Sequence, residues 1–230
     1  MRIRPIYHSG FLLEADEGSY IFDYYQGELP ELDVKKPVTV LSSHAHHDHY
    51  NPEIFTILRR RGAADVTAVL SHDIPEKRYP EGIPVISVKA GQTYSLPHGE
   101  RLETLLSTDE GVAFLLTLPE GTVYHAGDLN DWTWDGESDG DNRQMRGSYR
   151  HEIDKLAGRR IDVAFVPLDP RQEMYYADGM TYFLEKAGAA RVYPMHTWGQ
   201  PETILRFLNE YPQYRGTVLD EDAMKKEESL

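Results

Sequence analysis

The chain of 230 residues contains no cysteine, and this absence limits the metal chemistry that it can support. Disulfide bonds and thiolate ligands are excluded, so any metal ion must be held by nitrogen and oxygen atoms. No apolar stretch approaches the roughly 20 residues needed to cross a bilayer. The N-terminal segment MRIRPIYHSG lacks the apolar core of a signal peptide. We therefore expect a soluble, cytoplasmic protein that does not bind membranes.

Basic residues are also scarce. Lys and Arg number 24 against 38 Asp and Glu, which gives a net charge of −14. Such a charge repels polyanions, whereas nucleic-acid-binding proteins usually carry a basic patch. The expected partner is therefore a small-molecule substrate and not a nucleic acid, and a homo-oligomer is left open. The acidic segment 220–230 has few groups to bury. It predicts a frayed tail after a single domain at 1–219.

The order of predicted elements indicates an α/β layered domain. Two extended segments around Asp16-Glu17-Gly18 predict a β-hairpin. The apolar run PVTVLSS (37–43) predicts a buried strand, and Asn51-Pro52-Glu53 predicts the start of a helix that stops at Gly62. Strands are further predicted at 65–71, 83–88, 161–169 and 191–196, a strand meander at 94–128, and helices at 148–158, 178–188 and 201–211. Hairpins followed by strand-helix alternation are typical of sheets covered by helices.

The segment SHAHHDHY (43–50) holds four of the chain's ten histidines directly after the predicted buried strand. Side chains alternate along an extended segment, so His44 and His46 should lie on the same side. Asp48 and His49 follow in the turn beyond. Two nitrogen ligands and then an oxygen and a nitrogen can supply two adjacent metal ions from one loop. Borderline metals such as Zn²⁺ accept this donor set and keep a position open for water.

With this motif in place, the sequence resembles the metallo-β-lactamase superfamily. The family's H-x-H-x-D-H loop is matched by residues 44–49, and its Gly-Asp at a strand end by Gly127-Asp128. Its histidine after a late strand is matched by His196, and its early aspartate after a hairpin strand by Asp23. These landmarks occur in the expected order over nearly the whole chain. The most similar branch is the small one that includes the ascorbate-phosphate lactonase-like proteins.

The resemblance implies a four-layer αββα sandwich with two divalent metal ions at one edge. One ion would be held by His44 and His46, and the other by Asp48, His49 and His196. Asp128 would bridge the two ions, and Asp48 and Asp128 would be the catalytic carboxylates. Zinc is the expected metal, with manganese or iron as alternatives. Such an ion can lower the pKa of a bound water from 15.7 to about 7 and so supply hydroxide at neutral pH.

One departure from the family concerns the third ligand of the first ion. The family has a histidine roughly twenty residues before the Gly-Asp, and this chain has STDEG (107–111) there instead. Asp109 is the best-placed substitute. Three alternatives are open: Asp109 binds the metal, Asp109 accepts a hydrogen bond from a ligand, or His98 reaches the site from another turn. An oxygen ligand in place of imidazole strengthens the case for manganese or iron(II) as the alternatives to zinc.

Several further residues are candidates for supporting roles. Asp23 is predicted to accept the second N–H of a ligating histidine, with a turn aspartate as the alternative. Trp132 and Trp134 follow Asp128 closely and predict either a pocket wall or hydrophobic cover. The polar stretch 135–147 predicts a mobile lid.

Arg171 and Tyr175 follow another predicted strand at the same edge. They are candidates for clamping a substrate anion and for donating a hydrogen bond, with a surface salt bridge as the alternative for Arg171. The remaining histidines carry weaker signals. His8 is favoured as a structural residue, His47 as an exposed one and His125 as a structural one.

Taken together, these features predict a metal-dependent hydrolase that acts on a small-molecule ester, lactone or phosphoester. One alternative is a metal-binding or ligand-sensing protein whose degenerate site is inactive. A nuclease of the ribonuclease Z type shares the motif, but it would need a basic groove that the net charge of −14 does not favour.

Overall fold

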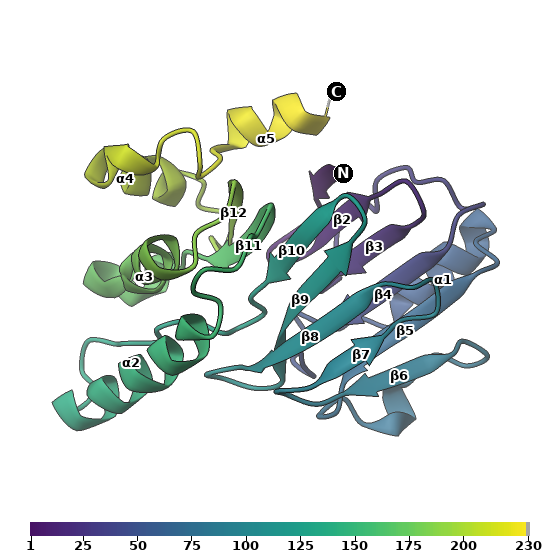
Figure 1. Ribbon diagram of the computed structural model, residues 1–230, viewed down its shortest axis with the longest axis horizontal. Helices are drawn as coiled ribbons and strands as arrows, with labels where there is room; N and C mark the ends of the chain where they lie inside the picture. The colour runs from purple at the N-terminus through teal and green to yellow at the C-terminus, as the bar shows by residue number, and fades with distance from the viewer. Residues whose placement is uncertain (229–230) are drawn as a thin grey trace.

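Two six-stranded β-sheets face each other in the computed structural model, which describes residues 1–228 (Figure 1). Their spatial orders are β1-β2-β3-β4-β5-β6 and β12-β11-β10-β9-β8-β7. The strands of the first sheet are β1 (Arg2–Pro5), β2 (Phe11–Glu14), β3 (Ser19–Phe22), β4 (Val38–Ser42), β5 (Val66–Ser71) and β6 (Val85–Val88). Those of the second are β7 (Thr93–Ser95), β8 (Arg101–Leu106), β9 (Val112–Leu118), β10 (Gly121–His125), β11 (Val163–Pro167) and β12 (Arg191–Met195).

Each sheet combines an antiparallel part with a parallel part. Strands β1 to β3 pair antiparallel, and β3 to β6 pair parallel. In the second sheet, β7 to β10 form an antiparallel meander, and β10, β11 and β12 are parallel. The predicted hairpin, the buried strand after it and the later meander are therefore confirmed. Within each sheet the parallel strands end at the same edge, where the loops that follow them can converge.

Alternating side chains of the first sheet are buried in two different hydrophobic cores, one on each face of the sheet. Val38 and Val40 of β4 pack on one face together with Leu58 of helix α1 (Glu53–Arg61). Leu41 points the other way, into the space between the sheets. This period of two follows from the pleat of a β-strand, and a strand that is buried on both faces reads as a continuous apolar run.

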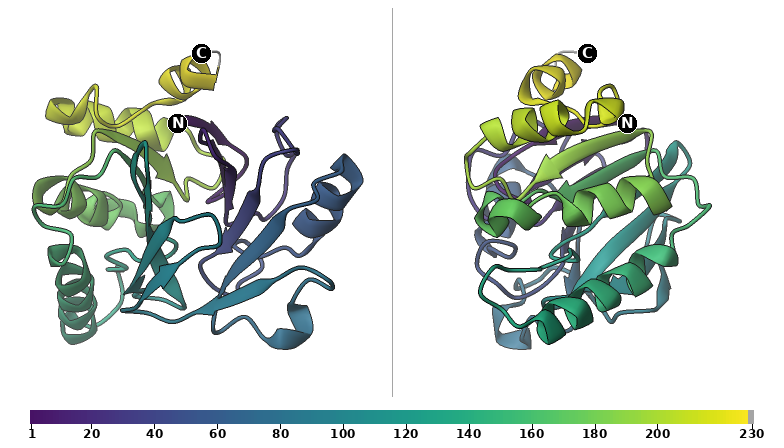
Figure 2. Two further views of the ribbon diagram at one scale, coloured as in Figure 1. Left: turned by 45° about the vertical axis from the view of Figure 1, so that its right-hand side comes forward. Right: turned by 90° about the vertical axis from the view of Figure 1, so that its left-hand side faces the viewer.

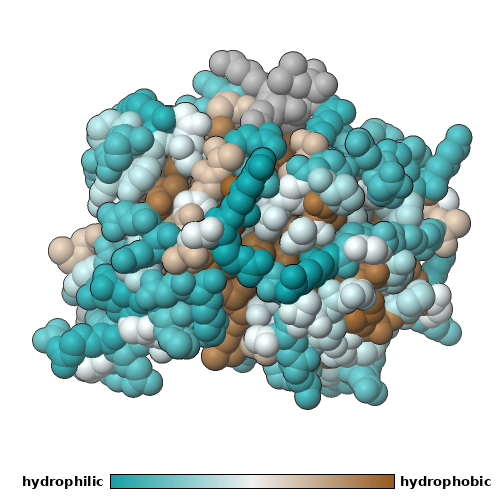
Figure 3. All heavy atoms as spheres, in the orientation of Figure 1, coloured by the Kyte–Doolittle hydropathy of each residue, from teal (hydrophilic) through white to brown (hydrophobic). Residues whose placement is uncertain are grey.

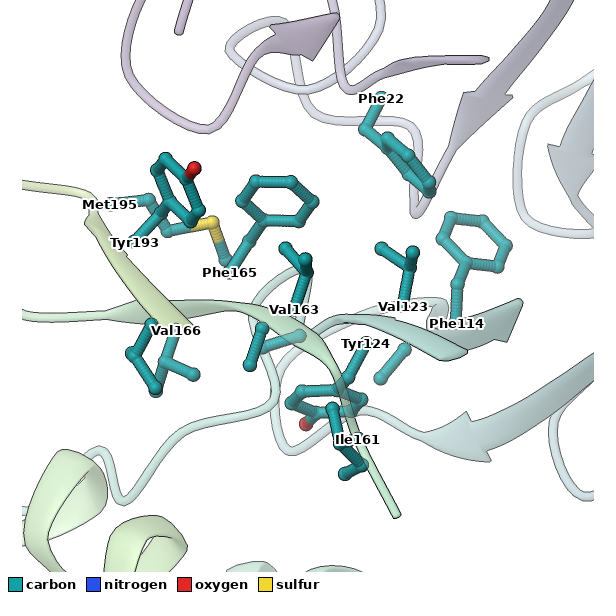
Figure 4. Close-up of a cluster of buried hydrophobic side chains, with 14 of the residues drawn as sticks. Phe22, Phe114, Val123, Tyr124, Ile161, Val163, Phe165, Val166, Tyr193 and Met195 are labelled. Carbon is teal, nitrogen blue, oxygen red and sulfur yellow. The ribbon is translucent and has the colours of Figure 1, made fainter. Parts of the chain in front are cut away.

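The core between the sheets is rich in aromatic rings. Phe165 and Val123 of the second sheet point toward Phe22 of the first, whereas Tyr124 points to the opposite side (Figure 4). The Tyr124 ring stacks on Phe183 of helix α3 at a centroid distance of 5.2 Å. The second sheet therefore buries both of its faces, one against the first sheet and one against helices.

The helices form the two outer layers. Helix α1 covers the outer face of the first sheet, and α2, α3 and α4 cover the outer face of the second (Figure 1 and Figure 2). The predicted αββα sandwich is confirmed. The remaining helical segments are α2 (Asp139–Asp154), α3 (Asp178–Lys186), α4 (Glu202–Glu210), α5 (Glu221–Glu228) and the short 3₁₀ turns η1 (Glu76–Arg78), η2 (Pro170–Tyr175) and η3 (Pro212–Tyr214).

Two predicted segments differ from the structure. Helix α2 begins at Asp139, so most of the stretch 135–147 is helical and not a loop-like lid. The Ser138 side chain accepts a hydrogen bond from the Asp141 N–H and caps this helix. The acidic segment predicted as a frayed tail is helical over Glu221–Glu228, because this helix packs against β1 and buries Met224. Residues 229–230 of that segment lie outside the described residues.

The surface is mainly hydrophilic. Hydrophilic residues cover most of the face shown in Figure 3, with small hydrophobic patches between them. Within residues 1–228, no helix combines the length and the apolar character that a membrane span requires.

Candidate metal centre

The candidate residues lie at the carboxyl ends of strands from both sheets. The histidine loop follows β4, Asp128 follows β10, and His196 follows β12. Asp23 follows β3 in the first sheet, and Asp169 follows β11 in the second. Loops that are distant in sequence thus meet at one edge of the sandwich, as expected for ligand sites in sheets with parallel strands.

One group of side chains consists of His44, His46, Asp109 and Asp128. Each of the four offers one ligand atom, and these atoms all lie within 4.8 Å of one another. His44 Nε2 lies 3.1 Å from His46 Nδ1 and 3.5 Å from Asp128 Oδ2. Asp109 Oδ2 lies 3.5 Å from His46 Nδ1. The structure thus brings Asp109 to the place where the sequence lacks a third histidine.

A second group consists of His8, Asp48, His49 and His196, whose ligand atoms also lie within 4.8 Å of one another. Asp128 reaches this group with its other oxygen. Its Oδ1 lies 3.2 Å from His49 Nε2 and 3.1 Å from His196 Nε2. One carboxylate therefore faces both groups, which is the position of a bridging ligand.

Hydrogen bonds fix which nitrogen of His49 and of His44 carries its proton. His49 Nδ1 lies 2.8 Å from Asp23 Oδ2 and donates to it, because an ionised carboxylate can only accept. His44 Nδ1 donates to Ser43 Oγ at 2.9 Å, and that hydroxyl donates to Asp23 Oδ2 at 2.6 Å. In the neutral form of both rings the proton therefore sits on Nδ1, and Nε2, which is directed at the centre, can bind a metal. Asp23 accepts the second N–H of His49, as the sequence predicted, and it acts on His44 only through the Ser43 hydroxyl.

His196 has an equivalent partner that the sequence reasoning missed. Its Nδ1 lies 3.1 Å from Asp169 Oδ2 and donates to it. Asp169 is fully buried and also accepts hydrogen bonds from Trp198 Nε1 and from the Arg171 side chain. The available signal was Asp-Pro directly after a buried strand at the same sheet edge as Asp128.

The buried polar atoms fit divalent cations. Asp128 Oδ1 is buried, and no hydrogen bond reaches it from the described residues, although two imidazole nitrogens lie within 3.2 Å. The Nε2 atoms of His49 and His196 are themselves only 3.3 Å apart. Unprotonated nitrogens and a carboxylate oxygen repel one another at such distances unless a cation lies among them. The mixed nitrogen and oxygen donors are those that zinc, manganese and iron accept.

The surroundings shift the pKa values of the candidate ligands in different directions. Burial lowers the pKa of His44 to about 4, so the ring is neutral at pH 7 and can bind a metal. Burial likewise disfavours charge on His49 and His196, but the nearby Asp128 carboxylate raises the pKa of both, so without a metal these rings favour a proton that a bound cation would displace. For Asp48, His8 and His49 outweigh burial and lower the pKa, which keeps this carboxylate ionised.

Unusual backbone conformations are concentrated here. Four of the five non-glycine residues with positive φ in the described chain are His8, Asp23, His196 and Trp198, with φ between 41° and 65°. Such conformations cost about 1–3 kcal/mol each and persist where the surroundings enforce them. The strain is consistent with side chains that are held in place for function.

The other histidines are placed as follows. His8 was favoured as structural, yet its ring belongs to the second group, with Nε2 3.4 Å from Asp48 Oδ2.

His47 is exposed, as predicted. His125 lies in the core, where it donates to Ser9 O and accepts from Gly127 N–H. His98 lies 3.4 Å from Asp65, outside both groups, so the prediction that it could replace the third histidine is wrong.

A pocket of about 250 Å³ opens beside the two groups. Trp132, Trp134 and Arg171 line it together with Asp128 and His196. Tyr175 lines a different cavity, of about 230 Å³, so its prediction as part of the substrate pocket is wrong. The cause is the turn η2 (Pro170–Tyr175), which carries Tyr175 away from the strand end and toward helix α2.

Comparisons with known proteins are consistent with this geometry. Residues 2–137 match a family model described as the beta-lactamase superfamily domain. A protein of *Pyrobaculum islandicum* named UPF0173 metal-dependent hydrolase is 34% identical over 140 residues, which is 56% of this chain and 61% of that protein. The chain thus spans about three fifths of the length of this curated relative.

Solved structures show the same fold at low sequence identity. Igni18, described as a metallo hydrolase from *Ignicoccus hospitalis*, has a TM-score of 0.67 and 18% identity, covering 95% of this chain and 94% of its own. CmlA from *Streptomyces venezuelae*, described as a diiron beta-hydroxylase, has a TM-score of 0.62 and 13% identity, covering 94% of this chain and 52% of its own. At these identities the likeness concerns the fold alone.

Proposed function

Since the chain belongs to the metallo-β-lactamase superfamily, we propose that it is a metal-dependent hydrolase acting on a small-molecule ester, lactone or phosphoester. The observation that carries the proposal is the arrangement of two ligand groups around one shared carboxylate: Asp128 completes the first group of four and also reaches the second group of four with its other oxygen. The name of the *Pyrobaculum* relative, metal-dependent hydrolase, supports it.

Two divalent cations would be held by these groups. His44, His46 and Asp109 would hold one, Asp48, His49, His196 and the added ligand His8 would hold the other, and Asp128 would contact both. When bound, such ions supply Lewis acidity, which makes water acidic enough to serve as a nucleophile and stabilises negative charge on the substrate. Zinc is the proposed metal, with manganese and iron as the alternatives that metal analysis distinguishes.

The protein's own groups have distinct tasks in this proposal. Asp23 and Asp169 hold the Nδ1 protons of His49 and His196, so the Nε2 atoms stay available as ligands. The Asp128 carboxylate balances the charge of the cations from a buried position. Asp48 is held ionised by its histidine neighbours and is about one-eighth exposed, so its carboxylate stays available as a ligand.

The proposal is tested by metal analysis combined with a panel of esters, lactones and phosphoesters. We expect about two equivalents of metal, turnover of at least one substrate class, and loss of turnover in Asp128→Ala. Asp162→Asn is a suitable control, because it removes the charge of a carboxylate that lies outside both ligand groups and accepts the Thr122 N–H. One tightly held equivalent without turnover on the whole panel would instead favour the metal-binding alternative.

A further inference from the structure

The pocket beside the candidate metal centre has an unusual wall. Its apolar side is formed by Trp132 and Trp134, whose rings lie parallel, 5.9 Å apart with an interplanar angle of 5°. Trp132 is buried, and its Nε1 donates to the backbone oxygen of Asp128 at 2.8 Å. This hydrogen bond fixes the position of Trp132 relative to Asp128, the proposed bridging ligand. Because the two rings are stacked, the pair is rigid and offers an outer ring face and ring edges, against which a planar apolar partner can pack.

Arg171 forms the cationic part of the same pocket. Its guanidinium carbon lies 4.4 Å from the centroid of Trp198 and 5.9 Å from that of Trp134, so the group is held between two aromatic rings. Nε donates to Asp169 Oδ1 at 2.9 Å, and Nη2 also donates to this carboxylate. Among the described residues, no hydrogen bond uses Nη1. Its two N–H groups are therefore available to a ligand.

The charge of Arg171 is only partly balanced by Asp169. The same carboxylate also accepts the Nδ1 proton of His196 and the Nε1 proton of Trp198. If His196 binds a cation, its imidazole carries part of the positive charge, and the single negative charge of Asp169 must then balance both His196 and Arg171. The guanidinium therefore keeps an attraction for a second carboxylate, which can accept hydrogen bonds from Nη1.

We infer that this pocket selects substrates in which the scissile bond is attached to a planar apolar group bearing a carboxylate. The ring would lie against Trp132 and Trp134, the carboxylate would accept hydrogen bonds from Arg171 Nη1, and the scissile bond would face Asp128 and His196. Pockets for drug-sized ligands measure about 300–1,000 Å³, so one of about 250 Å³ fits a single-ring metabolite. The inference rests on the proposed hydrolase function, although the binding it requires does not need turnover.

The chain carries its own reporter for such binding. All three of its tryptophans lie at this site: Trp132 and Trp198 have ring centroids 5.6 Å from His196, and Trp134 stacks on Trp132. Intrinsic tryptophan fluorescence therefore reports on the pocket alone. The probes are benzoate and benzamide, which share shape and ring but differ in charge. Both are titrated into the metal-loaded protein and into the chelator-treated protein.

We expect benzoate to bind at least about tenfold more tightly than benzamide, because a hydrogen bond to a charged group is the stronger kind. Arg171→Gln should remove this preference and leave the affinity for benzamide unchanged. Arg171→Lys, which keeps the charge but loses the guanidinium that can bond Asp169 and the ligand at the same time, should retain only part of this preference. Arg206→Gln is the matched control, because Arg206 is equally exposed (48% against 49%) and pairs with Glu210 outside the pocket.

Two outcomes would overturn the inference: equal affinities for benzoate and benzamide in the wild type, or an unchanged benzoate preference in Arg171→Gln. A preference that vanishes with chelation but survives in Arg171→Gln would assign the carboxylate to the metal and overturn it as well. Unchanged metal content and benzamide binding in Arg171→Gln exclude a collapsed pocket as the cause of a loss. A failure of the hydrolase proposal would appear separately, as absent turnover with the benzoate preference intact.

Discussion

Asp23→Asn is the substitution that best tests the hydrogen-bond arrangement of the metal centre. Asn has nearly the same size as Asp, and its oxygen can still accept the Ser43 N–H, which now bonds Asp23 Oδ1 at 2.7 Å. Its NH₂ group, however, replaces an acceptor by a donor at the position of Oδ2. His49 must then present an unprotonated Nδ1, which moves its proton to Nε2. Ser43 Oγ can no longer donate to residue 23 and donates to His44 Nδ1 instead, which switches that ring too.

The expected magnitude follows from these two tautomer changes. Loss of the partner that orients a ligating histidine costs about 10–100-fold in metal affinity, or about 1.4–2.8 kcal/mol. Because His44 and His49 belong to different ligand groups, both metal equivalents should weaken. Asp23 is fully buried and its carboxylate accepts three hydrogen bonds, so the metal-free fold should also lose about 1–3 kcal/mol.

The assay is a competition titration against a chelator of known affinity, accompanied by urea unfolding of the metal-free protein. Asp162→Asn again serves as the control, since its carboxylate accepts the Thr122 N–H at 2.9 Å but contacts no ligand group. The control should keep both metal affinities. If Asp23→Asn binds two equivalents within twofold of the wild-type affinity, the assigned tautomers are wrong.

Three further substitutions test separate parts of the site. Asp109→Ala should lower metal content to nearly one equivalent without unfolding, because the side chain is 43% exposed; unchanged metal content would remove Asp109 from the ligands. His8→Asn suits the positive φ of 59° and should weaken the second equivalent about tenfold or more by chelator competition; an unchanged affinity would return His8 to a structural role. Gly111→Ala should cost about 2–6 kcal/mol in urea unfolding, since a Cβ there would lie 2.0 Å from Ser43 O at a φ of +71°. Gly91→Ala, at φ +70° with open space around it, should cost only about 1–2 kcal/mol, and equal losses would refute the clash.

Much of the fold and of the ligand arrangement could be predicted because it depends on local pattern. Apolar runs such as residues 37–43 mark strands that are buried on both faces, and β4 lies there. The spacing of His44 and His46 places both side chains at one strand end. Asp109 was predicted because its sequence separation from Asp128 is close to that of the family's third histidine. In the structure, the antiparallel pairing of β8, β9 and β10 brings the two residues close together in space.

Other features could not be predicted because they depend on long-range packing. His8 reaches its group because the turn between β1 and β2 lies against the loop after β12, where the His196 N–H donates to His8 O and the two rings are 3.9 Å apart. In the sequence it is one histidine without neighbours. Tyr175 was misplaced because turn η2 changes direction at Glu173, which has a φ of 52°. The start of α2 was missed although Ser138 and Asp141 have the spacing of a helix cap, since the glycines and aspartates around them also suit a loop.

Asp169 links the two proposals, because the same carboxylate orients His196 and holds Arg171. A substrate carboxylate at Arg171 Nη1 would partly neutralise the guanidinium. Asp169 would then interact less strongly with Arg171 and more strongly with the Nδ1 proton of His196. The imidazole would then be a stronger electron donor toward its cation. Binding of the substrate anion and binding of the metal should therefore support each other, and by thermodynamic linkage the effect must be equal in both directions. Benzoate should accordingly tighten metal binding in the wild type by the same factor by which metal tightens benzoate, and this coupling should be absent in Arg171→Gln.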